Sequence, residues 1–312
     1  MYQNKYLKYK NKYLQLKNLM GGAPIYKGLQ LLGQGAENFA FLLPDGNTLR
    51  IRKDCETLGK NELATITKMK DNTPLYFVKI LAIGKCNDLR GRLKNDIVDF
   101  CDDKLLGDIC NYTYIMMETA PGGNFLQYYG LQFKDLLNKP NFDELIVSAD
   151  NQQKINAFVG FLFSFLNKIV DGLIDANTKL NGFIHKDFNY RNCNVVHSNG
   201  NPIIFDFGES KVGTIGDNSD ILNYIKEILE DVQLQSNVYI SVFPDYESKS
   251  PDEKILIKNN FYKLNKVLRA HPKINALITK YFVSAVTSYG GIRLSIGPSR
   301  ESLETFKTKL NS

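Results

Sequence analysis

The sequence predicts an α+β protein of two lobes, in which a small strand-rich lobe precedes a larger, mainly helical one. Residues 25–52 consist of short apolar runs separated by turns, whereas long segments with helical spacing begin only after residue 123. A chain of 312 residues with 43% hydrophobic content is long enough to bury a core in each lobe. The pattern changes at Pro121-Gly122-Gly123, so we expect the boundary at residues 119–123.

Residues 1–22 are expected to form a basic amphipathic leader. They hold five lysines and no acidic residue, which accounts for +5 of the formal net charge of +6. We expect the segment to be a helix that lies on the domain or on a partner helix, with peripheral contact to an anionic membrane or nucleic acid as the alternative. No specific nucleic-acid binding is expected, because the leader has no arginine.

The leader resembles the Lys/Tyr-rich leaders of proteins from nucleocytoplasmic large DNA viruses of the mimivirus kind. Gly21-Gly22-Ala23 is similar to the sites that the maturation proteases of such viruses cut. The resemblance implies an intracellular protein, in the host cytoplasm or the virion, and leaves open whether the leader is cleaved after Gly22.

Cysteine usage and hydropathy also favour an intracellular protein. Five cysteines occur without a CxxC pair, which disfavours a disulfide framework and a zinc site. The longest apolar run, residues 157–166, is half of the roughly 20 residues that span a bilayer, so we expect a buried helix and no transmembrane segment.

The small lobe is predicted to contain five strands and one helix. Three strands lie within residues 25–52, where Pro44-Asp45-Gly46 favours a hairpin turn. The remaining elements of this lobe are a helix at 59–70 and strands near 75–83 and 112–118. Helical spacing then predicts the helices of the large lobe at 125–138, 152–178, 217–232, 252–269 and 272–288.

The stretch GFIHKDFNYRNCNVV, residues 182–196, carries the residues best suited to catalysis. Asp187 and Asn192 lie five residues apart between two apolar strands, and their oxygens suit a hydroxyl proton and a Mg²⁺ ion respectively. Asp206 follows the next buried strand, in NPIIFDFGES. Together these hard oxygen ligands predict a site for a metal–triphosphate.

HKDFNYRN, followed 14 residues after Asn192 by DFG, resembles the catalytic loop and metal-binding motif of the protein-kinase-like superfamily. The resemblance implies a bilobal kinase fold with ATP and Mg²⁺ as cofactors. Asp187 would deprotonate the acceptor hydroxyl, and Asn192 and Asp206 would hold the metal. Arg191 occupies the place of the arginine that reaches the γ-phosphate in tyrosine kinases.

Two segments of the small lobe resemble the family's nucleotide-binding elements. LLGQGAENFA is similar to the Gly-rich loop, with Gly33 and Gly35 in place and Asn38 where a third glycine is usual. In LRIRK, a period of two places Lys53 on the face of the buried residues, as in the family's VAIK strand. LRIRK also resembles the strand of inositol-pentakisphosphate 2-kinases, in which an arginine binds phosphate, so Arg50 remains the alternative.

The resemblance extends to the helix and the hinge that follow. NELATITKM supplies Glu62, which would hold the phosphate-binding cation. YIMMETAPGG is similar to the hinge and implies Met117 as gatekeeper, with Glu118 and Ala120 offering backbone groups to adenine. Asn124 would lie near the ribose.

After DFG the chain departs from protein kinases. No APE motif follows, and Asp220 lies only 14 residues beyond Asp206. Asp220 looks like the aspartate of the family's buried αF helix, and the resemblance implies that it contacts and braces the catalytic loop. Three hypotheses remain: an ATP-dependent kinase acting on protein Ser/Thr or Tyr, a kinase of an inositol phosphate, aminoglycoside or choline-like molecule, and a pseudokinase scaffold.

Overall fold

A computed structural model of the chain describes residues 25–26, 29–34, 38–52, 60–85, 113–230, 236–286 and 292–311. The chain divides into two compact units. Unit 1 comprises Met1–Thr73 and Val78–Thr119, and unit 2 comprises Pro74–Phe77 and Ala120–Ser312. The division falls between Thr119 and Ala120, and the leader, Gly35 and Lys53 lie outside the described residues.

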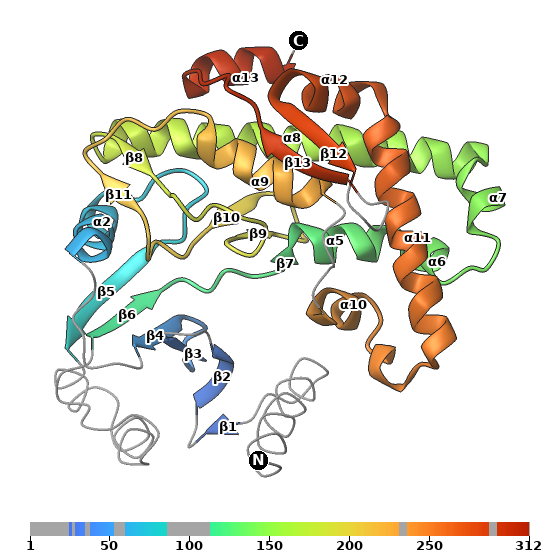
Figure 1. The fold of residues 1–312 in the computed structure, drawn as a ribbon. Helices are drawn as coiled ribbons and strands as arrows, with labels where there is room; N and C mark the ends of the chain where they lie inside the picture. Colours follow the sequence, from blue (N-terminus) through green and yellow to red (C-terminus); the bar gives the residue numbers. More distant parts are fainter. Residues whose placement is uncertain are drawn as a thin grey trace. The chain divides into compact units, whose positions relative to one another are not determined.

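Unit 1 contains an antiparallel sheet with the strand order β1-β2-β3-β4-β6-β5 (Figure 1). Its strands are β1 (Ile25–Tyr26), β2 (Leu29–Gln34), β3 (Asn38–Leu42), β4 (Thr48–Arg52), β5 (Ile80–Lys85) and β6 (Thr113–Met117). The sequence predicted five strands, because it treated the apolar run that begins at Ile25 as one strand. In the structure that run forms β1 and β2, which pair with each other.

The turn between β3 and β4 is the one that the sequence predicted. Gly46 has a φ of +83°, and Asp45 Oδ1 accepts a hydrogen bond from the Asn47 N–H at 3.0 Å. This left-handed conformation favours glycine. Leu49 and Ile51 of β4 are fully buried, so they lie on the apolar face, as the period of two predicted.

Helix α2 (Lys60–Asp71) follows β4 and matches the predicted helix within one residue at each end. Its buried positions are Glu62, Thr65, Ile66 and Met69, which recur at three- and four-residue steps. The buried face of α2 therefore includes one carboxylate.

Unit 2 begins with short helices. The predicted helix 125–138 is divided into α5 (Phe125–Gln132) and α6 (Lys134–Leu137), and a further helix, α7 (Phe142–Ile146), follows. The break lies at Phe133, which is fully buried and has a φ of −113° and a ψ of 14°. Burial of this aromatic ring accompanies the turn that separates α5 from α6.

Helix α8 (Ala149–Lys179) is the long helix that Figure 1 shows crossing unit 2. Ser148 caps its first turn, and the buried aromatic residues Phe158 and Phe165 both pack against Phe125 of α5. By length and composition α8 is apolar enough to cross a bilayer, although half of its most apolar window is buried inside the protein. The buried helix that the sequence predicted around residues 157–166 is part of α8.

Unit 2 also contains two small antiparallel sheets. The first has the order β10-β9-β7 and is formed by β7 (Gly123–Asn124), β9 (Cys193–Val195) and β10 (Pro202–Ile204). The second pairs β8 (Phe183–Ile184) with β11 (Lys211–Val212). Because β8 and β9 flank residues 185–192, these sheets fix both ends of that loop, which we call loop 185–192.

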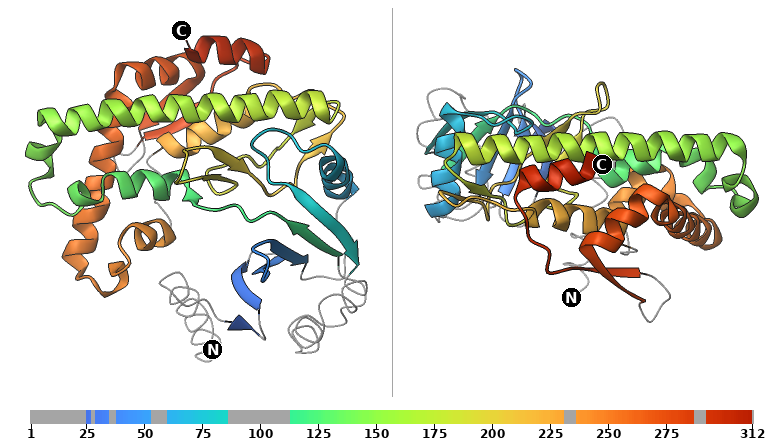
Figure 2. Two further views of the ribbon diagram at one scale, coloured as in Figure 1. Left: turned by 180° about the vertical axis from the view of Figure 1, so that it is seen from behind. Right: turned by 90° about the horizontal axis from the view of Figure 1, so that it is seen from above.

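The C-terminal part of unit 2 differs from the prediction. The helix expected at 272–288 ends at Tyr281, and the chain continues as β12 (Phe282–Val286), which forms a hairpin with β13 (Ile292–Ile296). Phe282 and the two valines of β12 favour a strand. Figure 2 shows this hairpin extending from the helices of unit 2. The other elements are α9 (Ser219–Leu229), α10 (Ser236–Val242), a 3₁₀ turn (Tyr246–Ser248), α11 (Pro251–Ala270), α12 (Pro272–Tyr281) and α13 (Leu303–Asn311).

Two glycines of α8 are expected to respond in opposite directions to substitution by alanine. A Cβ at Gly172 would lie 2.7 Å from the Leu75 carbonyl oxygen, whereas a Cβ at Gly160 would meet no atom within 4 Å. Alanine is favoured over glycine inside a helix by about 1 kcal/mol, but overpacking costs about 1–3 kcal/mol. Gly160→Ala should therefore raise the free energy of unfolding in urea, and Gly172→Ala should lower it. An increase in both variants would contradict this packing of Leu75 on α8.

Candidate functional site

Loop 185–192 holds the Asp187 carboxylate between two asparagine side chains. Asn189 Nδ2 donates to Asp187 Oδ1 at 2.9 Å, and Asn192 Nδ2 donates to Asp187 Oδ2 at 3.2 Å. Both amides also donate to the Asp187 carbonyl, at 3.2 Å from Asn189 and 2.7 Å from Asn192. The two asparagines are buried and Asp187 is exposed, so the loop fixes this carboxylate while leaving it open to solvent.

Asn189 also connects Asp187 to Arg191. Its side-chain oxygen accepts hydrogen bonds from the Arg191 N–H at 2.9 Å and from Arg191 Nε at 3.3 Å. The Arg191 guanidinium lies 5.8 Å from the centre of the Tyr190 ring. One asparagine therefore orients the carboxylate with its amide nitrogen and the cation with its amide oxygen.

Asn192 and Asp206 lie at the same end of the β9–β10 ribbon. Cys193 pairs with Ile204, and just beyond this pair the Phe205 N–H donates to the Asn192 carbonyl at 3.0 Å. The next residue, Asp206, is exposed and has a φ of +66°, a conformation that is costly for a residue other than glycine. The β-ribbon thus brings together the two residues that the sequence predicted as metal ligands.

The donor set at this end of the ribbon is small. Asn192 uses its amide nitrogen on Asp187, which leaves its amide oxygen as a potential ligand, and the Asp206 carboxylate is a second. Across the described ranges, no group of three or more His, Cys, Asp or Glu side chains is arranged to hold a metal ion. Two oxygen ligands suit Mg²⁺, which usually retains water and phosphate oxygens and takes one or two protein ligands.

Asp220, at the start of α9, fixes the entrance of loop 185–192. Its Oδ2 accepts the His185 N–H at 2.7 Å, and its Oδ1 accepts the Lys186 N–H at 3.0 Å. Burial raises the pKa of the Asp220 carboxyl, while His185 and the two donated N–H groups act in the opposite direction. The predicted contact of Asp220 with the loop is confirmed.

A series of aromatic rings that contact one another packs against loop 185–192. Phe207, directly after Asp206, stacks on Phe77 with 5.8 Å between ring centres, and it lies 5.8 Å from the His185 ring. His185 in turn contacts Phe188 at 5.2 Å, and Phe188 stacks on Tyr224 of α9 at 5.0 Å. These side chains are buried, so a packed layer of rings lies next to the residues that carry the exposed side chains of Asp187 and Asp206.

Glu227 is a residue of this site that the sequence analysis missed. The Tyr190 backbone, the Arg191 cation and the Asp187 carboxylate all lie close enough to influence the Glu227 carboxyl electrostatically. Burial raises the pKa of the Glu227 carboxyl, and the Arg191 cation opposes this shift. Its spacing from Asp220 was a usable signal, because positions seven apart lie on one face of a helix.

In unit 1, the structure brings the alternative cation, Arg50, to the predicted glutamate. Arg50 Nη1 lies 3.4 Å from Glu62 Oε1, and the side chains are 15% and 3% exposed. Lys53, which the period of two favoured, lies outside the described residues, as does Gly35. Gly33 lies within β2, at an irregularity in its pairing with β3.

The predicted hinge residues occupy several different local environments. Met117 ends β6, and the Glu118 N–H donates to the Lys79 carbonyl at 3.0 Å. The Ala120 carbonyl accepts a hydrogen bond from Asn194 Nδ2 at 3.0 Å. Asn124, whose contact with the ribose stays a prediction, caps α5: its side-chain oxygen accepts the Gln127 N–H at 3.0 Å.

Removing the Asp220 carboxylate is expected to destabilise unit 2. Asp220→Ala leaves the buried His185 N–H without an acceptor, which costs about 1–3 kcal/mol for each such donor. Asp220→Asn retains one acceptor oxygen and should lose less stability. Chemical unfolding of both variants tests this, with Asp143→Ala as the control because its ion pair with Lys263 is exposed. Equal stability of all three variants would exclude a structural role for the carboxylate.

Comparisons with known proteins leave the family of this chain unassigned. No family model and no curated protein matches it. Among solved structures, it is similar to the kinase PK-1 of the Cydia pomonella granulovirus, with 12% sequence identity and a TM-score of 0.35. That match covers 59% of this chain and 52% of the granulovirus kinase, so it spans about half of that protein. This similarity to a granulovirus protein does not support the resemblance to mimivirus-like proteins.

Proposed function

We propose that this chain is an ATP-dependent phosphotransferase that passes the γ-phosphate of ATP to a hydroxyl group. The arrangement of Asp187 carries the proposal. Its exposed carboxylate is held by Asn189 and Asn192, and Asn192 lies beside Asp206 across the β9–β10 ribbon. Phosphoryl transfer requires a positioned base and oxygen ligands for a metal ion. A fixed carboxylate next to a pair of hard oxygen ligands can supply both.

Asp187 acts as the general base in this proposal. A carboxylate accepts the proton of the attacking hydroxyl only when it is held within hydrogen-bond distance of it. The two amide donors hold Asp187 at both oxygens, and its exposure gives an acceptor molecule access. The carboxylate is therefore already oriented before the substrate binds, which lowers the entropy lost on reaching the transition state.

Asn192 and Asp206 would hold Mg²⁺ together with the phosphates of ATP. A bound Mg²⁺ ion would neutralise phosphate charge and orient the γ-phosphate. The strained backbone of Asp206 supports this assignment, since such conformations concentrate at functional sites. Asn192 is itself a proposed metal ligand, and its buried amide nitrogen donates to the proposed base, Asp187.

Two cations are proposed to bind phosphate oxygens. Arg191 is exposed and oriented by Asn189, so it is suited to stabilise the charge of the transition state. Arg50 is the second, because its guanidinium lies within ion-pair distance of Glu62, and Lys53 remains its alternative. The nucleotide contacts proposed from the sequence are those of Gly33, Gly35, Met117, Glu118, Ala120 and Asn124.

The acceptor that we favour is a Ser, Thr or Tyr hydroxyl of a protein. A small-molecule acceptor is the second candidate, and the segment after Asp206 favours it. Only 14 residues separate Asp206 from Asp220, and within them β11 pairs back onto β8. This leaves little chain to form a platform for a peptide. A pseudokinase is disfavoured because Asp187, Asn192 and Asp206 are all present.

Asp187→Asn is expected to abolish phosphotransfer while leaving the fold intact. The substitution removes the base but keeps the size of the side chain, so transfer from labelled ATP should fall about a hundredfold or more. The assay offers the full chain a panel of proteins, inositol phosphates and amino sugars with Mg²⁺. Labelled products identify the acceptor class directly.

Asp135→Asn is the matched control, because Asp135 is an exposed carboxylate on α6 and outside the proposed site. Its activity should equal that of the unmodified protein. If Asp187→Asn retains full transfer, Asp187 is not the base. If the unmodified protein labels no member of the panel, the phosphotransferase proposal loses its support.

A further inference from the structure

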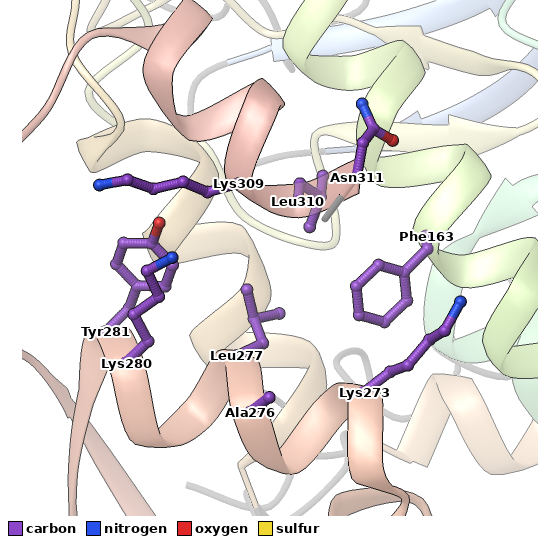
Figure 3. A pocket seen from close by; sticks show the side chains of 9 residues that line it. All are labelled: Phe163, Lys273, Ala276, Leu277, Lys280, Tyr281, Lys309, Leu310 and Asn311. Carbon is purple, nitrogen blue, oxygen red and sulfur yellow. The ribbon is translucent and has the colours of Figure 1, made fainter.

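A pocket in unit 2 lies between helices α8, α12 and α13, and none of its lining residues belongs to the site described above. Its volume is about 250 Å³. Figure 3 shows an apolar floor formed by Phe163, Leu277 and Leu310. Three lysines surround this floor: Lys273, Lys280 and Lys309.

The lysines differ in how their charges are balanced. Lys309 pairs with Glu301, which also accepts a hydrogen bond from the Tyr281 hydroxyl at 2.6 Å. Lys273 and Lys280 have no carboxylate within ion-pair distance in the part of the chain that the structure describes. Their amines instead lie over aromatic rings, 5.9 Å from the centre of Phe163 and 5.5 Å from that of Tyr281. Lys280 lies close enough to Glu301 to lower the pKa of that carboxyl, so Glu301 balances part of the charge of Lys280 as well as that of Lys309. Among the described residues, Lys273 is thus the rim cation whose charge is least balanced.

Helix α12 arranges these charges in a regular order. Lys273, Ala276, Leu277 and Lys280 occupy positions i, i+3, i+4 and i+7, which lie on one face of a helix. A rise of 1.5 Å per residue separates the two lysines by about 10 Å along the helix axis. A ligand in the pocket thus meets a cation, an apolar surface and a second cation in succession.

The size of the pocket limits what it holds. Sites for drug-sized molecules and cofactors measure roughly 300–1,000 Å³, and this pocket is smaller. One apolar side chain fits better than a whole cofactor. A nucleic acid is also disfavoured, because base stacking needs open aromatic faces, whereas Lys273 lies over Phe163 and Tyr281 is buried.

We propose that this lysine-rimmed pocket binds an acidic peptide segment of a partner protein. One apolar side chain of the peptide would occupy the floor at Leu277, and flanking Asp or Glu side chains would pair with Lys273 and Lys280. Burial of the apolar side chain supplies binding free energy, and the ion pairs supply selectivity for acidic sequences. The proposal is independent of phosphotransfer.

The direct test uses a fluorescein-labelled peptide, Gly-Asp-Glu-Leu-Asp-Glu-Gly, and the full-length chain. Fluorescence anisotropy should show saturable binding that weakens with added salt, because exposed ion pairs are screened. Replacing the leucine by serine, or the four acids by their amides, should weaken binding about tenfold, since each change removes one of the two kinds of contact. Equal binding of all three peptides would overturn the proposal.

Variants of the protein locate the site. Lys273→Glu combined with Lys280→Glu should weaken peptide binding about tenfold or more, because two attractive charges become repulsive. The matched control is Lys258→Glu combined with Lys266→Glu, which makes the same change of charge at exposed positions of α11. Ala276→Phe fills the pocket from an exposed position without removing a core side chain, and it should also reduce binding.

Two outcomes would contradict the inference. If the α11 control pair weakens binding as much as the α12 pair, the peptide responds to net charge and not to this pocket. If an oligonucleotide or anionic phosphatidylserine vesicles bind in a way that depends on Lys273 and Lys280 while no acidic peptide binds, the ligand is of another class. Circular dichroism of each variant confirms that the comparison is between folded proteins.

Discussion

The arrangement of the site depends on the hydrogen bonds that the buried carboxylate of Asp220 accepts. This carboxylate accepts the backbone N–H groups of His185 and Lys186, and thus fixes the point at which loop 185–192 leaves β8. A buried carboxylate without such donors would be costly, and two buried backbone N–H groups without an acceptor would be costly as well. The carboxylate and the two N–H groups therefore stabilise each other, and these hydrogen bonds fix the loop relative to α9.

Within that fixed frame, short polar side chains set the geometry of the exposed groups. Asn189 and Asn192 hold Asp187, and Asn189 also orients Arg191. Glu227, further along α9, lies close enough to Arg191 and Asp187 to interact with both electrostatically. Asn189 places a neutral amide beside Asp187, and the neighbouring positive charge comes from Arg191, which the same amide orients.

The sequence predicted those features that local chemistry determines. The turn at Gly46 and the helix α9 follow from residue type and spacing, whereas the role of Asp220 was implied by a resemblance. The capping role of Asn124 was missed although it is local, because it depends on the Gln127 N–H three residues on. The hairpin after Tyr281 was missed because the pairing of β12 with β13 cannot be seen in either strand alone. Lys53 stays a prediction, because the described ion pair of Glu62 is the one with Arg50.

We propose that Asn192, in the loop held by Asp220, and Asp206, which follows β10, form a magnesium–triphosphate site. Calorimetric titration of the full chain with a non-hydrolysable ATP analogue, with and without Mg²⁺, tests this site. We expect Mg²⁺ to strengthen binding in the unmodified protein, and we expect Asp206→Asn to remove this dependence. Nucleotide affinity that is the same with and without Mg²⁺ in the unmodified protein would contradict it.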